Sequence, residues 1–169
     1  IELEEFTTNQ LADIVKLNLS GYKLAQSTLD TIASVTRGNA RDVQKVCQKI
    51  LIYLDGSGKK TFNLDDWNKL CKRTNIKPLG LKNAEINILR VLGQVSQMRL
   101  TQLSSMTGIN RNALQKDLEM YLQKRNLIEI NPTGRKITEV GMNYLKGLDA
   151  ADKPKPAKKK AVRKRKATK

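Results

Sequence analysis

The chain has 169 residues, enough for one domain or two small ones, and a formal net charge of +16. Residues 153–169 hold ten Lys/Arg and no acid, while the residues before them carry 22 Lys/Arg against 16 Asp/Glu, or +6. A mildly basic body with a cationic tail favours a polyanionic partner, either nucleic acid or an anionic membrane surface. The chain has no run of about 18 apolar residues, which excludes a transmembrane helix.

The residue types also exclude several kinds of site. The chain has no His, and Cys47 and Cys71 lie far apart within helical apolar patterns. We therefore expect reduced core thiols and no zinc site. It has neither a P-loop sequence nor G-x-S-x-G, so this chain alone is not expected to hydrolyse ATP. It begins at Ile1 within "IELEEF", without a signal-peptide pattern, as expected of a fragment of a longer protein.

Residues 1–78 are predicted to form four short helices. A capping box, Thr7-x-x-Gln10, begins the first of them. Apolar residues recur at helical spacing in each, so each helix has an apolar stripe that needs partners, and the four should pack together. The predicted helices run from Thr7 to Gly21, from Ser27 to about Val35, from about Ala40 to Leu54 and from Asn63 to Leu70.

The stretch "NIKPLGLK", residues 75–82, contains the Pro and Gly of a connection, and we place a domain boundary after residue 78. Residues 79–149 then follow the order helix, extended piece, helix, Gly turn, helix, hairpin, helix. This is the order of a winged helix-turn-helix DNA-binding domain. Its predicted helices are Asn83–Val95, a short helix capped by Thr101, Asn110–Lys124 and Glu139–Leu145, with Met98–Leu100 extended and a hairpin within Leu127–Gly141.

The hairpin is the predicted wing. Its turn is Asn131–Gly134, and two cations, Arg135 and Lys136, follow the tip, where long side chains can reach phosphates or a minor groove. The Thr133 hydroxyl and the Gly134 backbone are expected to approach the same phosphate. A solvated surface hairpin is the alternative, but the surrounding order is that of a DNA-binding module, so we favour DNA contact.

Two further surfaces could bind nucleic acid. The outward face of the helix after Asn110 should present polar side chains able to read bases, although an ordinary solvated face fits it equally well. The tail is of low complexity, is expected to be disordered, and could neutralise several phosphates or act as a localisation signal. These residues are Asn112, Gln115, Lys116, Glu119 and Gln123 on the helix, and Lys158, Lys159, Lys160, Arg163, Lys164 and Arg165 in the tail.

One arginine of the first region has an unusual position. Arg41 falls in the first turn of the third predicted helix, after "TRGNA", where the helix dipole disfavours a cation. It could reach an anionic ligand such as a nucleotide phosphate. It could also be a surface arginine paired with Asp42 or another nearby acid, and from the residues alone this pairing is favoured.

Four stretches of the chain can be compared with known families: Leu3–Val15, Thr36–Arg41, Pro78–Leu81 and Asn131–Thr138. By their order and spacing they resemble the RuvB family of bacterial Holliday-junction branch-migration motors. The resemblance covers about residues 1–148 and implies two domains that follow an AAA+ nucleotide-binding domain in that family. The implied fold is mainly α: a four-helix AAA+ lid, a winged helix-turn-helix with a small β-hairpin wing, and then the disordered basic tail.

The resemblance implies roles for particular residues. Arg41 matches the lid arginine called sensor 2, which contacts nucleotide phosphates. Phe6 matches an aromatic position, usually Tyr, near the adenine, and Ile14 matches an apolar position beside it. Arg135 matches the wing arginine that meets DNA. The chain has Asn39-Ala40 where the family usually has Thr-Pro, and the basic tail is not a feature expected of the family.

The resemblance implies the C-terminal part of an ATP-driven motor that binds duplex DNA through its wing and drives branch migration in recombination and repair. ATP, with Mg²⁺, would bind through an upstream domain. The implied partners are duplex or junction DNA, the upstream AAA+ domain, neighbouring ring subunits and a junction-recognition protein, with no membrane. The implied location is the cytoplasm of a bacterial or phage-infected cell, at the nucleoid. The alternatives are a stand-alone winged-helix or nucleoid protein, and a replication-initiator or clamp-loader AAA+ protein.

Overall fold

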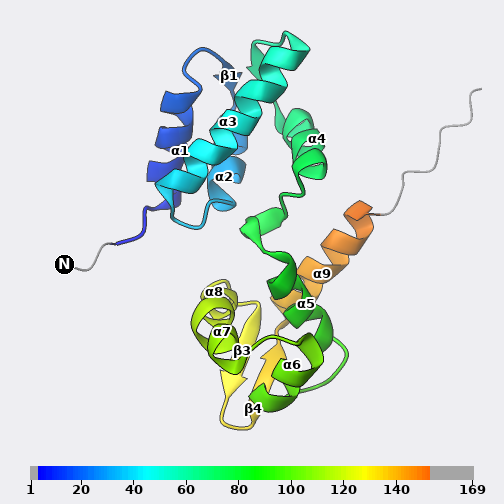
Figure 1. Ribbon diagram of the computed structural model, residues 1–169. Helices are drawn as coiled ribbons and strands as arrows, with labels where there is room; N and C mark the ends of the chain where they lie inside the picture. Colours follow the sequence, from blue (N-terminus) through cyan, green and yellow to red (C-terminus); the bar gives the residue numbers. More distant parts are fainter. Residues whose placement is uncertain (1–3, 153–169) are drawn as a thin grey trace, which may run out of the picture. The chain divides into compact units, whose positions relative to one another are not determined.

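The computed structural model describes residues 4–152, which divide into two compact units with the boundary between Asn83 and Ala84 (Figure 1). Both units are built mainly from helices, and the second contains a small β-hairpin. The predicted fold class is therefore confirmed. Within residues 4–152, no helix combines the length and the apolar character needed to cross a membrane.

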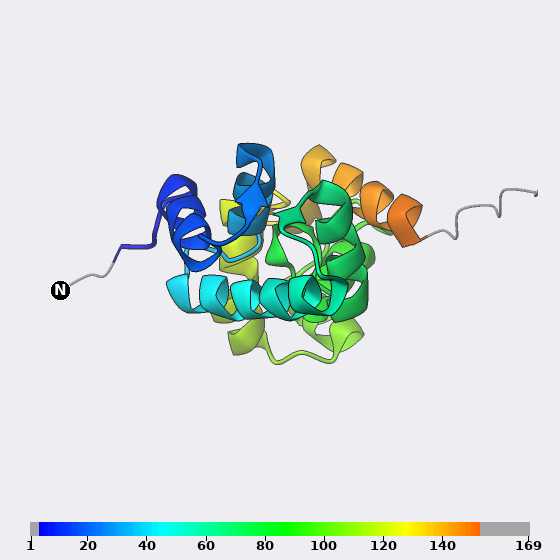
Figure 2. The same cartoon turned by 90° about the horizontal axis from the view of Figure 1, so that it is seen from above.

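The first unit contains the four predicted helices and a pair of short strands. Helices α1, α2 and α3 contact one another, and Figure 2 shows the long cyan α3 beside the blue α1 and α2. Strands β1 and β2 pair in parallel, Lys23 with Thr61 and Leu24 with Phe62, which the sequence did not predict. The elements are α1 (Thr8–Asn18), β1 (Lys23–Leu24), α2 (Gln26–Ser34), α3 (Ala40–Ser57), β2 (Thr61–Phe62), α4 (Leu64–Thr74) and the 3₁₀ turn η1 (Pro78–Gly80).

The predicted helix starts are correct where a side chain caps the helix. The capping box of α1 is confirmed: the Thr7 hydroxyl accepts from the Gln10 N–H, and the Gln10 side chain accepts from the Thr7 N–H. Asn63 caps α4 by accepting from a backbone N–H of its first turn. The predicted cap at Ser27 is wrong, because α2 already includes that residue and begins without a side-chain cap. The first helix also ends at Asn18, short of the predicted glycine.

The core of the first unit contains two cysteine side chains and one buried carboxylate. Cys47 is buried and Cys71 half-buried, both as free thiols, and burial raises the pKa of each to about 11, so they stay protonated at neutral pH. Asp66, only 1% exposed, accepts hydrogen bonds from the Tyr53 hydroxyl (3.0 Å) and the Lys59 ammonium (2.7 Å). Burial would raise the pKa of Asp66, but these hydrogen bonds outweigh it and hold the pKa below its ordinary value. The ionised carboxylate thereby links α3 to α4.

The Pro/Gly connection belongs to the first unit. The Arg37 guanidinium donates to the Gly80 carbonyl through Nε (3.0 Å) and Nη2 (2.7 Å). Gly80 has a φ of 63°, and a Cβ at this position would lie 2.1 Å from the Val35 carbonyl oxygen. Only glycine fits there. The turn therefore packs against the end of α2, and the boundary between the two compact units falls after Asn83.

The second unit has the element order predicted for a winged helix. The wing strands β3 and β4 pair antiparallel, and Met98 adds a single bridge to β4 at Arg135. Along the wing, Ile128 and Ile137 are buried, whereas Glu129 and Lys136 are exposed. The elements are α5 (Asn83–Leu92), α6 (Leu100–Thr107), α7 (Arg111–Ala113), the π-helical η2 (Leu114–Glu119), α8 (Met120–Lys124), β3 (Ile128–Asn131), β4 (Gly134–Ile137) and α9 (Glu139–Asp152).

Several predicted boundaries in this unit differ from the structure. Helix α5 ends at Leu92, before the predicted Val95, and α6 begins one residue before the predicted cap at Thr101. Helix α9 continues to Asp152, so residues 150–152 belong to a helix and not to the tail. The helix predicted from Asn110 is present, but its middle is a π-helix flanked by α7 and α8.

We expect Gly80→Ala to destabilise the first unit by at least about 1 kcal/mol, because Ala adds a Cβ against the Val35 carbonyl at a positive φ. Urea unfolding followed by fluorescence measures this directly, since Trp67 is the only tryptophan in the chain and is buried in this unit. Gly56→Ala is the matched control. It lies in α3 with no atom within 4 Å of an added Cβ, and should stabilise by about 0.5–1 kcal/mol. Equal stabilities of the two variants would contradict the close packing at Gly80.

Candidate nucleic-acid interface

The tip of the wing is fastened by one side chain. Asn131 Oδ1 accepts from the Gly134 N–H (2.9 Å), the Thr133 hydroxyl (2.7 Å) and Gln97 Nε2 (2.6 Å). Thr133 is exposed at the tip, as a DNA contact requires. Gly134 is buried, because its backbone lies so close to Met98 that a Cβ would be 2.6 Å from the Met98 carbonyl oxygen. The tip is thus held to the segment that precedes α6.

The two cations after the tip lie on opposite faces of the hairpin. Lys136 is exposed and pairs in register with Glu129. Arg135 lies on the inner face and forms a bidentate ion pair with Glu119 of η2, Nε to Oε1 at 2.8 Å and Nη2 to Oε2 at 3.1 Å. The two side chains are only 13% and 3% exposed. Arg135 is therefore not a freely extended side chain, as the sequence suggested, but half of a buried link between β4 and η2.

Glu119 does not lie on the outward face of its helix, where the sequence analysis placed it. The residue is 2% exposed, and Leu114 and Leu118 of the same segment are buried with it. A π-helix bonds residue i to i+5, which widens the turn and changes which residues share a face. Because η2 is π-helical, a 3.6-residue period misplaces Glu119. The remaining residues predicted for the outward face are exposed: Asn112, Gln115, Lys116 and Gln123.

The signal for the inward position of Arg135 was present in the sequence. Successive residues of a strand point to opposite faces, so Arg135 shares a face with Ile137. Ile137 is buried, and Arg135 is turned inward with it. No comparable signal identified Gln97, whose contact with the tip depends on the fold.

Two of the three residues predicted to face a nucleotide, Phe6 and Arg41, lie near the loop that precedes α3. The Phe6 N–H donates to the Gly38 carbonyl (3.2 Å), three residues before Arg41, and the Phe6 side chain is 46% exposed. Arg41 is exposed in the first turn of α3. The expected pairing with Asp42 is wrong: Asp42 pairs with Lys45 at 3.2 Å, and Arg41 has no recorded side-chain partner within residues 4–152.

Ile14 lies on the inner side of α1. It is half-buried and packs against the core of the first unit. An exposed aromatic ring and an exposed cation beside one loop are groups that suit the base and the phosphates of a nucleotide. The structure gives Phe6 and Arg41 this arrangement and gives Ile14 a packing role.

The predicted tail contacts lie outside the described residues. They are Lys158, Lys159, Lys160, Arg163, Lys164 and Arg165.

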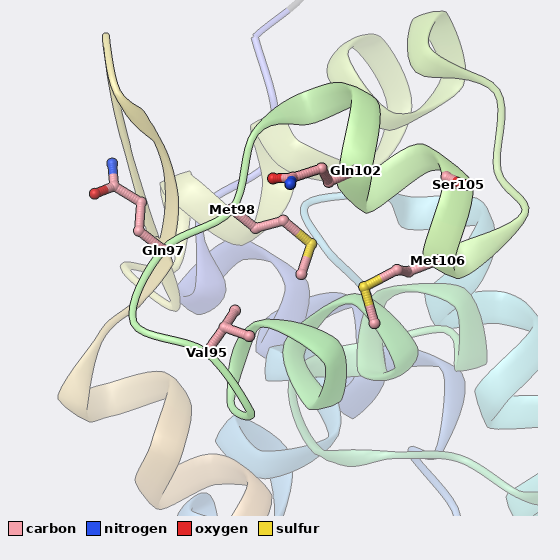
Figure 3. A pocket seen from close by; sticks show the side chains of 6 residues that line it. All are labelled: Val95, Gln97, Met98, Gln102, Ser105 and Met106. Carbon is pink, nitrogen blue, oxygen red and sulfur yellow. The ribbon is translucent and has the colours of Figure 1, made fainter.

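A shallow pocket of about 300 Å³ lies beside the wing. The side chains of Met98 and Met106 point into it, as Figure 3 shows, and Gln97 on its rim also contacts the wing tip. Its lining is Val95, Gln97, Met98, Gln102, Ser105 and Met106, none of them titratable at neutral pH. In the described part of the chain, no group of His, Cys, Asp and Glu could hold a metal ion.

Residues 78–146 match the family model of the RuvB C-terminal winged helix domain. This region is thus similar to the winged helix domain of RuvB proteins. The prediction of a RuvB-like C-terminal part is therefore confirmed. The match includes the turn η1, the helices α5 to α8 and the whole wing.

Relatives named RuvB extend the similarity to the first unit. The chain is 25% identical over 148 residues to the Holliday junction branch migration complex subunit RuvB of Ureaplasma urealyticum serovar 10, covering 85% of this chain and 46% of that protein. It is 32% identical over 81 residues to the protein of that name in Mycoplasma pneumoniae, covering 47% of this chain and 26% of that protein.

A solved structure, the Thermotoga maritima RuvB Holliday junction branch migration motor, has a similar fold, with a TM-score of 0.72 at 24% identity. The similarity covers 86% of this chain and 50% of the Thermotoga chain. The chain thus spans about half the length of the RuvB proteins that it matches.

We expect Arg135→Ala to lower the free energy of unfolding by about 3 kcal/mol, because it leaves the Glu119 carboxylate buried without its cation. The matched control is Lys136→Ala, the next residue of β4, whose exposed side chain should contribute less than about 0.5 kcal/mol. Thermal and urea unfolding followed by circular dichroism measure the difference. Equal stabilities would show that the buried ion pair makes no net contribution to the fold.

Proposed function

We propose that this chain is the lid and winged-helix part of a RuvB-like, ATP-driven motor that binds duplex DNA and drives Holliday-junction branch migration. The observation that carries the proposal is the match of residues 78–146 to the RuvB winged helix domain, on a unit whose hairpin has the form of a wing. The similarity of the first unit to RuvB proteins supports the assignment of that unit as the lid.

The wing would hold the DNA backbone. Thr133 and Lys136 are exposed at and beside the tip and can reach phosphates without rearrangement. Arg135 would present the edge of its guanidinium that Glu119 does not use, since Nη1 makes no recorded hydrogen bond within residues 4–152. Contacts to phosphates carry little sequence information, which suits a motor that must pass over every sequence.

Two other groups of residues would add affinity for DNA. The exposed polar face of the helix after Asn110 can contact the same duplex, although an ordinary solvated face remains the alternative. The tail would add salt-dependent, sequence-independent affinity by releasing counterions from the DNA. The Gly134 backbone is a weaker candidate, because its N–H already donates to Asn131.

The lid would contribute to nucleotide binding through Arg41 and Phe6. ATP with Mg²⁺, bound chiefly by an upstream AAA+ domain, would supply the free energy for movement by phosphoryl transfer. Arg41 would bind phosphate oxygens, for which its exposed guanidinium is available, and Phe6 would lie against the base. Ile14, which packs against the core of the first unit, would contribute only indirectly, by holding α1 in place. The neighbouring ring subunits and a junction-recognition protein complete the proposed assembly.

The decisive test uses the complete protein, expressed from the gene with the coding sequence upstream of Ile1. We expect it to separate a synthetic four-way DNA junction into duplexes only when ATP and Mg²⁺ are present, measured by gel electrophoresis of labelled strands. A matched linear duplex is the control substrate. ATP-independent binding to particular duplex sequences, without junction separation, would instead favour a stand-alone winged-helix protein.

In that complete protein, Arg41→Ala should reduce ATP turnover by at least about tenfold, because it removes a cation from the phosphates. Thermal stability should be unchanged, since the Arg41 side chain has no recorded partner in the described residues. Lys49→Ala, an exposed cation two turns further along α3, is the charge-matched control and should keep normal turnover. Normal turnover in Arg41→Ala would leave this arginine as an ordinary surface residue.

A further inference from the structure

Arg135 is fixed at both its ends. Its backbone forms two hydrogen bonds with Met98. The Arg135 N–H donates to the Met98 carbonyl (2.7 Å), and the Met98 N–H donates to the Arg135 carbonyl (2.9 Å). Its guanidinium is held by both carboxylate oxygens of Glu119. A long side chain bound in this way has little rotamer entropy left to lose when it binds a further ligand.

The Glu119 carboxylate uses only one edge of the guanidinium. Arg has five N–H donors in a planar fork, and Glu119 accepts from Nε and Nη2. Nη1, with two donors, has no recorded partner within residues 4–152. The guanidinium can therefore keep its carboxylate and still donate to a phosphate oxygen, and such charge-assisted hydrogen bonds are the strong ones.

We propose that Glu119 is a positioning residue for DNA binding: it aims Arg135 at the DNA backbone and locks the wing to η2. The inference rests on the proposed function, because it assumes that the wing binds DNA. It adds a residue that makes no DNA contact of its own, being 3% exposed at its side chain. It also assigns a purpose to the π-helical segment, since η2 ends at Glu119 and buries it.

The inference predicts an effect opposite in sign to simple electrostatics. Removing an acid from a DNA-binding protein raises its net charge and ordinarily strengthens its affinity for DNA. If Glu119 positions Arg135, its removal must weaken affinity instead, because the freed arginine loses its fixed direction. Glu129 provides the comparison: it is an exposed acid of β3, beside the exposed Lys136, so its removal changes the charge by the same amount.

The experiment measures the affinity of the 169-residue chain for a fluorescein-labelled duplex of mixed sequence by anisotropy, across a series of salt concentrations. The variants are Glu119→Gln, Glu129→Gln, Arg135→Gln and the double variant Glu119→Gln/Arg135→Gln. We expect Glu119→Gln to bind about tenfold more weakly and to lower the salt slope by about 1, whereas Glu129→Gln should bind as tightly as the native chain or tighter. In the Arg135→Gln background, Glu119→Gln should have no further effect on affinity.

A loss of folding cannot imitate this result. Melting of each variant by circular dichroism gives the folded fraction at the assay temperature. Arg135→Lys, which keeps the positive charge but lacks the planar fork, is a milder second variant. It should also bind more weakly if direction matters. Native affinity in Arg135→Lys would mean that charge alone counts, and would overturn the inference.

Other outcomes separate this inference from the proposed function. If Glu119→Gln binds as tightly as Glu129→Gln, or weakens binding equally when Arg135 is already Gln, Glu119 does not act through Arg135. If Arg135→Gln keeps native affinity while Lys136→Gln loses it, the wing binds DNA without Arg135; the inference falls and the proposed function stands. If the native chain does not bind duplex DNA even at low salt, the proposed DNA contacts fall, and the inference with them.

Discussion

A charge taken out of water must be neutralised where it lies, and each unit contains a buried carboxylate whose ion pair joins two of its elements. In the first unit Asp66 receives Lys59 and Tyr53, which links α3 to α4. In the second, Glu119 receives Arg135, which links η2 to the wing. Leaving either carboxylate buried without its cation would cost several kcal/mol, so the elements that carry the partners are held in register. The apolar cores supply most of the stabilisation, while these ion pairs determine how particular elements meet.

The sequence predicted most of the helices, the wing and its turn, because caps and periodicity are local signals. Thr7, Asn63 and the Asn131–Gly134 turn are cases in which neighbouring residues alone determine the conformation. The predictions failed where contacts between distant segments, or a departure from regular helix geometry, determine the conformation. The parallel pairing of β1 with β2 joins residues far apart in the chain, and the π-helix displaces Glu119 from the face that a regular helix would give it. The hairpin was therefore predicted with its turn, whereas the contacts of Arg135 with Glu119 and of Asn131 with Gln97 were not predicted.

The wing combines residues of different availability. Its outer face and tip offer Lys136 and Thr133 directly to solvent, while its inner face is committed to packing and to the Glu119 pair. A hairpin with both faces free would tilt easily, and a phosphate contact on it would cost more ordering entropy. The tip is fastened through Gln97, and β4 through Met98 and Glu119, so the exposed groups stand on a rigid support. Such a support suits repeated binding to the phosphate backbone of DNA, the ligand proposed for the wing.

Two arginines with different neighbours lie close together in the chain, Arg37 in the loop between α2 and α3 and Arg41 in the first turn of α3. Arg37 grips the Gly80 carbonyl of the connecting turn, and Arg41, four residues later, stands exposed at the start of α3. At Gly80 the backbone of that turn lies in close contact with the Val35 carbonyl, so the turn also packs against the end of α2. If Arg41 binds a phosphate as proposed, a displacement of Arg41 would also move the loop that precedes α3. The hydrogen bonds from Arg37 to Gly80 would pass this movement to the chain just before α5, without passing it through the body of any helix.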